Sequence, residues 1–258
     1  MPILMIGCGR MGGAMAGRWC QSQRVFAYDP QSVLPEGVER VARLSDFLDV
    51  EDLVIVLAIK PQAFDEVVPD LAPFGARRHL FLSVMAGITL ERMQRALGGA
   101  RRITRAMPSI ASIVGAGITA IVAAEGIGEV EKARIGQLLD AMGDHLWLEF
   151  EEDLDLVTAI SGSGPAYFYR MTEALSNAGT RAGLPPAIAA KLARAAFTGA
   201  AAFAAHDQRS IAELREQVTS PGGTTAAGLK QLNDEAALET LIDRVVMSAA
   251  TRSRELAR

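Results

Sequence analysis

The sequence predicts an α/β protein in which a doubly wound, parallel β-sheet is followed by an all-helical region. Short apolar runs alternate with helical patterns over the first 150 residues, and strand-like runs cease after that point. The run at 52–59 (DLVIVLAI) is almost continuously apolar, which is typical of a parallel strand covered on both faces. Alternation of this kind with short loops favours right-handed crossovers between parallel strands.

The expected elements of the first half follow in chain order. Besides 52–59, strands are expected at Ile3–Ile6, Val25–Tyr28, 79–84, 102–107, 117–122 and 145–148. Helices are expected at 11–21, 61–71 and 90–97. Residues 1–150 are therefore predicted to form one sheet-containing domain.

The second half, 151–258, is predicted to be a helical domain. Its helices are expected at 165–182, 185–205, 223–233 and 235–256. The first two open with Pro165 and Pro185, and proline is well tolerated in the first helical turn because its missing N–H would have no partner there.

The expected helix at 185–205 is apolar on nearly all sides. Eleven of its twenty-one residues are alanine, and Lys191 and Arg194 are its only charged residues. A helix of this kind is buried. A helical region of about 100 residues has little interior, so we expect a second subunit to cover it in a homodimer. A core helix inside a monomer is the alternative.

Composition excludes several classes of protein. The 258 residues include 26 Lys and Arg and 30 Asp and Glu, a net charge of −4 without a basic run for nucleic acid or anionic membranes. Two cysteines and three histidines provide neither a disulfide framework nor a metal-binding spacing, so no metal is expected. The N-terminal apolar run spans four residues, far fewer than the roughly 18 of a membrane helix, and no basic leader precedes it. We expect a soluble, cytoplasmic protein.

A glycine-rich motif, G-x-G-x-x-G, follows the first expected strand and opens the first helix. Gly7 permits the tight turn, Gly9 lets a pyrophosphate approach the backbone, and Gly12 lets helix and strand pack closely. The helix N-terminus offers N–H groups to the phosphates. This context predicts a Rossmann-like dinucleotide site, in which Cys8 is interpreted as a small filler.

Asp29 ends the second expected strand, seventeen residues after Gly12. An acidic residue there accepts hydrogen bonds from the adenosine ribose and repels a 2′-phosphate. No Lys or Arg occurs in 30–39. NADH is therefore expected to serve at least as well as NADPH. The alternative is that Asp29 only caps a turn before Pro30.

Two further segments end strands, AIKP at 58–61 and SVMAG at 83–87. Ligands of open α/β sheets bind beyond the carboxyl ends of the strands, so both segments should face the cofactor. A solvated cap is the alternative for Lys60.

Two glycine-rich segments punctuate the helical half. SGSGPAY at 161–167 is typical of a tight helix crossing that needs small residues, and we favour this over direct catalysis. SPGGTT at 220–225 precedes a helix, where its glycines and hydroxyls could cradle an anion. A plain helix cap is the alternative.

Taken in order, the glycine-rich start, AIKP, SVMAG, RAMPS at 105–109, SGSGPAY and SPGGTT resemble the pyrroline-5-carboxylate reductases over nearly the whole chain. The resemblance implies reduction of the cyclic imine 1-pyrroline-5-carboxylate to L-proline with NADPH or NADH, in the final step of proline biosynthesis. It also implies a Rossmann domain followed by a helical dimerisation domain, with larger assemblies of dimers.

The resemblance carries roles over to particular residues. Thr225 matches the hydroxyl near the imine nitrogen and is the expected catalytic residue. Substrate contacts are expected from Ser220, Gly223, Thr224, Thr225 and Glu151. Cofactor contacts are expected from Ile6, Gly7, Cys8, Gly9, Arg10, Met11, Gly12, Asp29, Ser45, Ala58, Ile59, Lys60, Pro61, Val84, Met85, Ala86 and Gln217.

The chain departs from the family's pattern in places. RAMPS ends in Ser109 where the family usually has Asn, Asp29 replaces a residue more favourable to phosphate, and the match of Glu151 is ambiguous with Glu152.

The chemistry agrees with the residues available. Hydride addition to a protonated imine needs positioning more than a strong acid, and none of the three histidines lies in a site motif. A β-hydroxyacid dehydrogenase or general imine reductase is one alternative, but such dehydrogenases carry a catalytic Lys in a stretch that here, at 165–182, has none. A non-catalytic NAD(P)-binding protein is the other.

Overall fold

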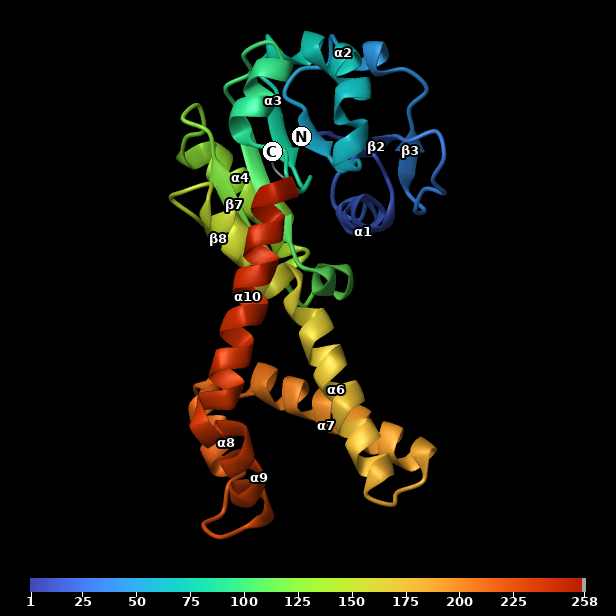
Figure 1. Cartoon of the computed structure of the whole chain (residues 1–258). Coiled ribbons are helices and arrows are strands. Elements are labelled where there is room, and N and C mark those ends of the chain that lie inside the picture. Colours follow the sequence, from blue (N-terminus) through green and yellow to red (C-terminus); the bar gives the residue numbers. More distant parts are fainter. Residues whose placement is uncertain (257–258) are drawn as a thin grey trace. The chain divides into compact units, whose positions relative to one another are not determined.

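The computed structural model describes residues 1–256, and they form two compact units (Figure 1). The first unit comprises residues 1–162 together with the end of the chain from residue 249 onward. The second comprises residues 163–248. The division of the chain after residue 150 stays a prediction.

The first unit is built on one sheet. Its eight strands, within the described residues, lie in the order β3-β2-β1-β4-β5-β6-β7-β8. They are β1 (Ile3–Ile6), β2 (Val25–Tyr28), β3 (Val38–Arg40), β4 (Val54–Leu57), β5 (Leu80–Ser83), β6 (Ile103–Pro108), β7 (Gly117–Ala123) and β8 (Gly143–Trp147). Every neighbouring pair is parallel except β6 and β7. The strand order reverses between β1 and β4, which is where open α/β sheets bind ligands.

Apolar side chains on both faces explain why the central strands form. All four residues of β1 are buried: Leu4 and Ile6 join one core cluster, while Ile3 and Met5 join the other. Strand β4 is buried in the same way. The helices of this unit are α1 (Arg10–Trp19), α2 (Phe64–Gly75), α3 (Leu90–Ala96), α4 (Glu129–Asp140) and the short α5 (Asp153–Val157). The fold therefore has the covered parallel sheet that the apolar runs predict.

The second unit is helical. A π-helical turn at Thr158–Gly162, which ends the first segment of the sheet unit, precedes it. Its helices are α6 (Gly164–Arg181), α7 (Pro186–His206), α8 (Ile211–Gln217), α9 (Thr224–Asn233) and most of α10 (Ala237–Leu256). Within it, Phe168 and Tyr169 of α6 pack against Phe197 of α7.

The α/β class is confirmed, and most elements lie close to their predicted positions. The elements that were not predicted include one strand and two helices of the sheet and helical units. Strand β3 has only three residues, two of them charged, and α4 buries only a narrow stripe. Helix α8 begins at a capping box, Ser210 with Glu213, which is a readable sequence signal. The parallel sheet is confirmed with one exception. Strands β6 and β7 are antiparallel, because a short connection at 109–116 joins them and only an antiparallel pair can be joined this way.

Candidate dinucleotide-binding site

The glycine-rich turn joins β1 to α1 at the point where the strand order reverses. Gly7 has φ +92°, and a Cβ there would lie 2.7 Å from the Ala58 carbonyl oxygen. A Cβ on Gly12 would lie 2.5 Å from the Gly7 carbonyl oxygen. At Gly9, in contrast, a Cβ would meet no described atom within 4 Å. Gly7 and Gly12 are therefore required by packing, whereas Gly9 leaves the space in front of the turn open.

Helix α1 begins at this open space. Gly9 is its N-cap, and no side chain within the described residues caps the first turn. Arg10 is exposed beside it, and Met11 is half-buried. The first N–H groups of a helix lack partners within the helix, so this end can bind a phosphate.

Asp29 is bound to the same turn. One carboxylate oxygen accepts a hydrogen bond from the Cys8 N–H at 2.7 Å, and the other accepts from Gln31 and Ser32 at 2.9 Å each. Burial alone would raise the pKa of Asp29, but these backbone hydrogen bonds lower the pKa to about 2. Asp29 thus caps its own turn and also fixes the glycine-rich turn. Its predicted ribose contact stays a prediction, since a carboxylate can accept further hydrogen bonds.

The thiol of Cys8 faces the core. The residue is buried, and burial, followed by the Asp29 carboxylate, raises the pKa of the thiol. The thiol therefore stays protonated, in agreement with a small filling side chain, and only its backbone N–H takes part in the turn.

Arg40 is a candidate that sequence reasoning missed. It ends β3, and its guanidinium donates hydrogen bonds to the backbone carbonyls of Asp29 and Ser32. It lies one residue beyond the stretch 30–39, which lacks Lys and Arg. Recognising β3 would have revealed it, because β3 runs parallel to β2 and ends at the same edge of the sheet.

The other predicted cofactor residues follow β4 and β5. Ala58 donates a backbone hydrogen bond to Ile6, and Val84 donates one to Leu57, so both segments continue from the carboxyl edge of the sheet. Ile59 is half-buried and Lys60 is exposed. The remaining predicted residues in this unit are half-buried Pro61, buried Met85, exposed Ala86 and exposed Ser45. Their contacts with a cofactor stay predictions.

Glu151 also lies in the first unit. Its Oε1 accepts hydrogen bonds from the Arg105 guanidinium at 2.8 Å and from the Leu90 N–H at 2.9 Å. Glu152 is exposed. Buried Ser109 accepts a hydrogen bond from the Ile118 N–H through its hydroxyl. A substrate contact of Glu151 stays a prediction.

The predicted substrate loop lies in the second unit and precedes α9. Gly222 has φ +71°, and Gly223 is the N-cap, with its N–H donating to the carbonyl of Ser220. Thr224 and Thr225 are exposed in the first helical turn. The loop therefore presents two hydroxyls and a helix N-terminus to solvent within this unit, as an anion site requires.

Gln217 ends α8 in the same unit. Its side-chain oxygen accepts a hydrogen bond from Arg209 at 2.7 Å, and Arg209 also forms an ion pair with Asp207. Its predicted cofactor contact stays a prediction.

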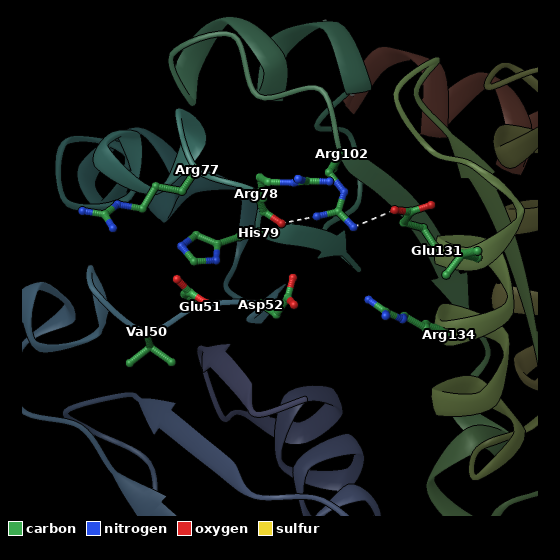
Figure 2. A pocket seen from close by; sticks show the side chains of 10 residues that line it. Val50, Glu51, Asp52, Arg77, Arg78, His79, Arg102, Glu131 and Arg134 are labelled. Atoms are coloured by element: carbon green, nitrogen blue, oxygen red, sulfur yellow. Dashed lines mark hydrogen bonds and ion pairs between the residues drawn. The ribbon is translucent and has the colours of Figure 1, made fainter.

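A charged cavity of about 610 Å³ lies at the opposite edge of the sheet, where β4, β5 and β6 begin (Figure 2). Arg102 there forms an ion pair with Glu131 at 2.7 Å, and Arg134 extends from α4 toward the cavity. Burial and the nearby Arg77 lower the pKa of His79, which keeps it neutral. Ligands of these sheets bind at the carboxyl ends, so this cavity is not assigned to the cofactor. Among residues 1–256, no cluster of His, Cys, Asp and Glu could hold a metal ion.

The fold and the glycine-rich turn define a dinucleotide-binding oxidoreductase with a helical C-terminal region. Residues 2–87 match the family described as "NADP oxidoreductase coenzyme F420-dependent", and residues 151–256 match "Pyrroline-5-carboxylate reductase dimerisation". The pyrroline-5-carboxylate reductase of Pseudomonas aeruginosa is 35% identical over 99% of this chain and 96% of its own. That of Synechocystis sp. is 42% identical over 79% of this chain and 74% of its own.

Solved structures agree. A pyrroline-5-carboxylate reductase from Coxiella burnetii matches with a TM-score of 0.90 and 31% identity, over 99% of this chain and 98% of that one. The fold is also that of a Plasmodium falciparum pyrroline carboxylate reductase with NADP bound. That structure matches with a TM-score of 0.83 and 24% identity, over 100% of this chain and 98% of that one. The chain belongs to the pyrroline-5-carboxylate reductase family, which confirms the resemblance seen in its motifs.

The two packed glycines and the open one predict opposite effects of substitution. Gly9→Ala should lower the melting temperature by only about 2–4 °C, the cost of alanine at an N-cap. It should weaken NADH binding about tenfold or more, because its methyl group enters the space in front of the turn. Gly12→Ala should instead lower the melting temperature strongly, because its Cβ has no room. Fluorescence titration and thermal unfolding measure both. Unchanged NADH affinity in Gly9→Ala would place the pyrophosphate elsewhere.

Asp29 predicts a pH-dependent contribution to stability. Its folded-state pKa is below the ordinary value, so its contribution is complete above about pH 4 and is lost as the pH falls toward 2. Asp29→Ala should cost on the order of 1–2 kcal/mol at pH 7, and the difference from wild type should narrow below about pH 4. Urea unfolding at several pH values tests this. A difference that does not vary between pH 7 and pH 3 would contradict the assigned hydrogen bonds.

Proposed function

We propose that this protein is a pyrroline-5-carboxylate reductase, which transfers hydride from a reduced nicotinamide cofactor to 1-pyrroline-5-carboxylate and forms L-proline. The observation that carries this proposal is the 35% identity with a reductase of that name along 99% of the chain. The hydride adds to the imine carbon while the nitrogen holds a proton, and the cofactor leaves as NAD(P)⁺. A protonated imine accepts hydride without a strong general acid, so binding and orientation are the main tasks of the protein.

The loop before α9 is proposed to bind the substrate. The backbone N–H groups of Thr224 and Thr225 follow the N-cap Gly223 at a helix N-terminus, where the helix dipole favours the substrate carboxylate. The exposed Thr225 hydroxyl supplies a directional hydrogen bond near the imine nitrogen. Ser220 is proposed to shape the loop, because its carbonyl accepts the hydrogen bond from Gly223.

A spectrophotometric assay tests the proposal. Purified protein should oxidise NADH or NADPH when pyrroline-5-carboxylate is added, with L-proline formed in equal amount. Turnover of a 3-hydroxy acid in place of the imine would favour a hydroxyacid dehydrogenase. Tight cofactor binding with no turnover of the imine would favour a non-catalytic NAD(P)-binding protein.

Thr225→Ala should lower turnover by about ten- to a hundredfold, because one positioned hydrogen bond is lost. Thr225→Ser keeps the hydroxyl and is the matched control, with turnover expected within about threefold of wild type. Steady-state kinetics with saturating cofactor measures both. If Thr225→Ala reduces the imine at the wild-type rate, Thr225 has no part in the reaction.

Both NADH and NADPH are proposed as cofactors. Asp29 disfavours a 2′-phosphate through its charge, whereas the Arg40 guanidinium lies next to the turn at 29–32 and can compensate a phosphate there. Arg40 is exposed and bonds only backbone carbonyls among the described residues, so it can turn toward a phosphate without breaking an ion pair.

Arg40→Ala should therefore raise the KM for NADPH about tenfold and change the KM for NADH by less than about twofold. Arg24→Ala is a control, because Arg24 is also an exposed arginine beside β2 and β3, but it precedes β2 at the amino edge and pairs with Glu39. Initial rates with each cofactor measure the ratio. Equal effects of Arg40→Ala on NADH and NADPH would remove the proposed phosphate contact.

A homodimer through the helical unit is also proposed. Within residues 1–256, helix α7 is the one helix that is long and apolar enough to cross a membrane. Only Ala189 and Ala193 of this helix are buried in the single chain. Large apolar side chains of this unit stay exposed, among them Phe168, Leu192 and Phe203. A second copy would bury this surface, and the match of 151–256 to a dimerisation family supports that partner.

Sedimentation at micromolar concentration should therefore give the mass of two chains or, for an assembly of dimers, of a larger even number of chains. A stable, monodisperse monomer at this concentration would contradict the dimer.

Cys8 and Cys20 are free thiols, which agrees with the reducing cytoplasm proposed as the site of action.

A further inference from the structure

Arg105 on β6 is a buried charge in the core of the first unit. Its side chain is only 5% exposed, and its guanidinium forms an ion pair with Glu151 at 2.8 Å. A buried ion pair contributes little net stability, because taking both charges out of water costs about as much as their attraction returns. The placement of this pair therefore calls for a role other than stability alone.

The carboxylate of Glu151 has a second partner on the same oxygen. Its Oε1 accepts the N–H of Leu90, the first residue of α3, at 2.9 Å. That N–H has no partner within its own helix, because it belongs to the first turn. Glu151 therefore fixes the start of α3, and Arg105 fixes Glu151.

The segment 84–89 connects β5 to α3. Arg105 lies beside one of its ends in the sheet and is linked to the other end through Glu151. At one end, Ser83 of β5 lies opposite Arg105 in the register of the parallel pair β5–β6. At the other end, Leu90 is held by Glu151 and through it by the Arg105 side chain. The segment contains Val84, Met85 and Ala86, which are predicted cofactor contacts, and it turns at Gly87 with φ +73°.

We propose that Arg105 and Glu151 are positioning residues, whose ion pair holds the segment 84–89 in the conformation that receives the nicotinamide. This inference rests on the proposed cofactor site. In this proposal the pair acts on cofactor binding through the loop. It fixes the end of the loop at Leu90, so its loss loosens the loop and weakens nicotinamide binding.

A second ion pair of the same unit provides a matched control. Arg102 directly precedes β6 and pairs with Glu131 at 2.7 Å (Figure 2). The Glu131 carboxylate also accepts a hydrogen bond from the backbone N–H of Gly128. In both pairs, an arginine in or next to β6 bonds a glutamate whose carboxylate also accepts a backbone N–H at the start of a helix. Only Arg105–Glu151 adjoins the loop at the carboxyl edge, whereas Arg102–Glu131 lies at the amino edge.

The experiment compares Glu151→Gln and Glu151→Ala with Glu131→Gln and Glu131→Ala in the full-length protein. The readouts are the melting temperature, the NADH dissociation constant from fluorescence titration, and kcat and KM for both substrates. Glu151→Gln keeps an acceptor for the Leu90 N–H but loses the charge that Arg105 requires. It should therefore fold and show an intermediate effect.

Glu151→Ala should raise the NADH dissociation constant about tenfold, and Glu151→Gln should raise it about threefold. The Glu131 variants should lower the melting temperature but leave the NADH dissociation constant within about twofold of wild type. Equal effects of the two sets on NADH binding would overturn the inference. So would an unchanged NADH constant with a raised KM for the imine, which would make Glu151 a substrate contact. Because NADH binding is measured without turnover, failure of the proposed reaction would show itself separately in the assay.

Discussion

The close packing of the first turn against the end of β4 is the constraint on which the candidate site depends. Gly7 and Gly12 have no space for a side chain, because the Ala58 carbonyl and the turn itself fill it. This contact brings α1 against the sheet at the point where the strand order reverses. The helix N-terminus then faces the open space at Gly9, which is where we propose that the pyrophosphate binds.

Two carboxylates hold the loops at the carboxyl edge, and they do so in the same way. Asp29 accepts the backbone N–H of Cys8 in the turn after β1, and Glu151 accepts the backbone N–H of Leu90 after the loop that follows β5. In each case the acid lies outside the loop and binds one N–H at its border. Bonds of a backbone N–H to an ionised carboxylate are among the stronger hydrogen bonds in proteins. The two acids therefore add to the order that the buried side chains of Cys8, Met85 and Ile88 give these loops.

The parts of the structure that local pattern determines were predictable. The buried strands and the glycine-rich turn follow from residues close together in the sequence, and they lie where the sequence predicts them. Arg40 was missed because it is carried by β3, a strand too short and polar to show a period. The partner of Glu151 was missed because Arg105 lies 46 residues away, and only the pairing of β6, β7 and β8 brings the two together. Long-range polar pairs of this kind leave no local signal.

Hydrogen exchange on addition of NADH tests most directly whether the nucleotide lies on the β1–α1 turn. The account predicts slower exchange of amides in 7–13 and 84–90 when NADH is bound, with little change at 49–52 and 77–79 beside the amino-edge cavity. Protection confined to the amino edge, with unchanged exchange in 7–13, would contradict it.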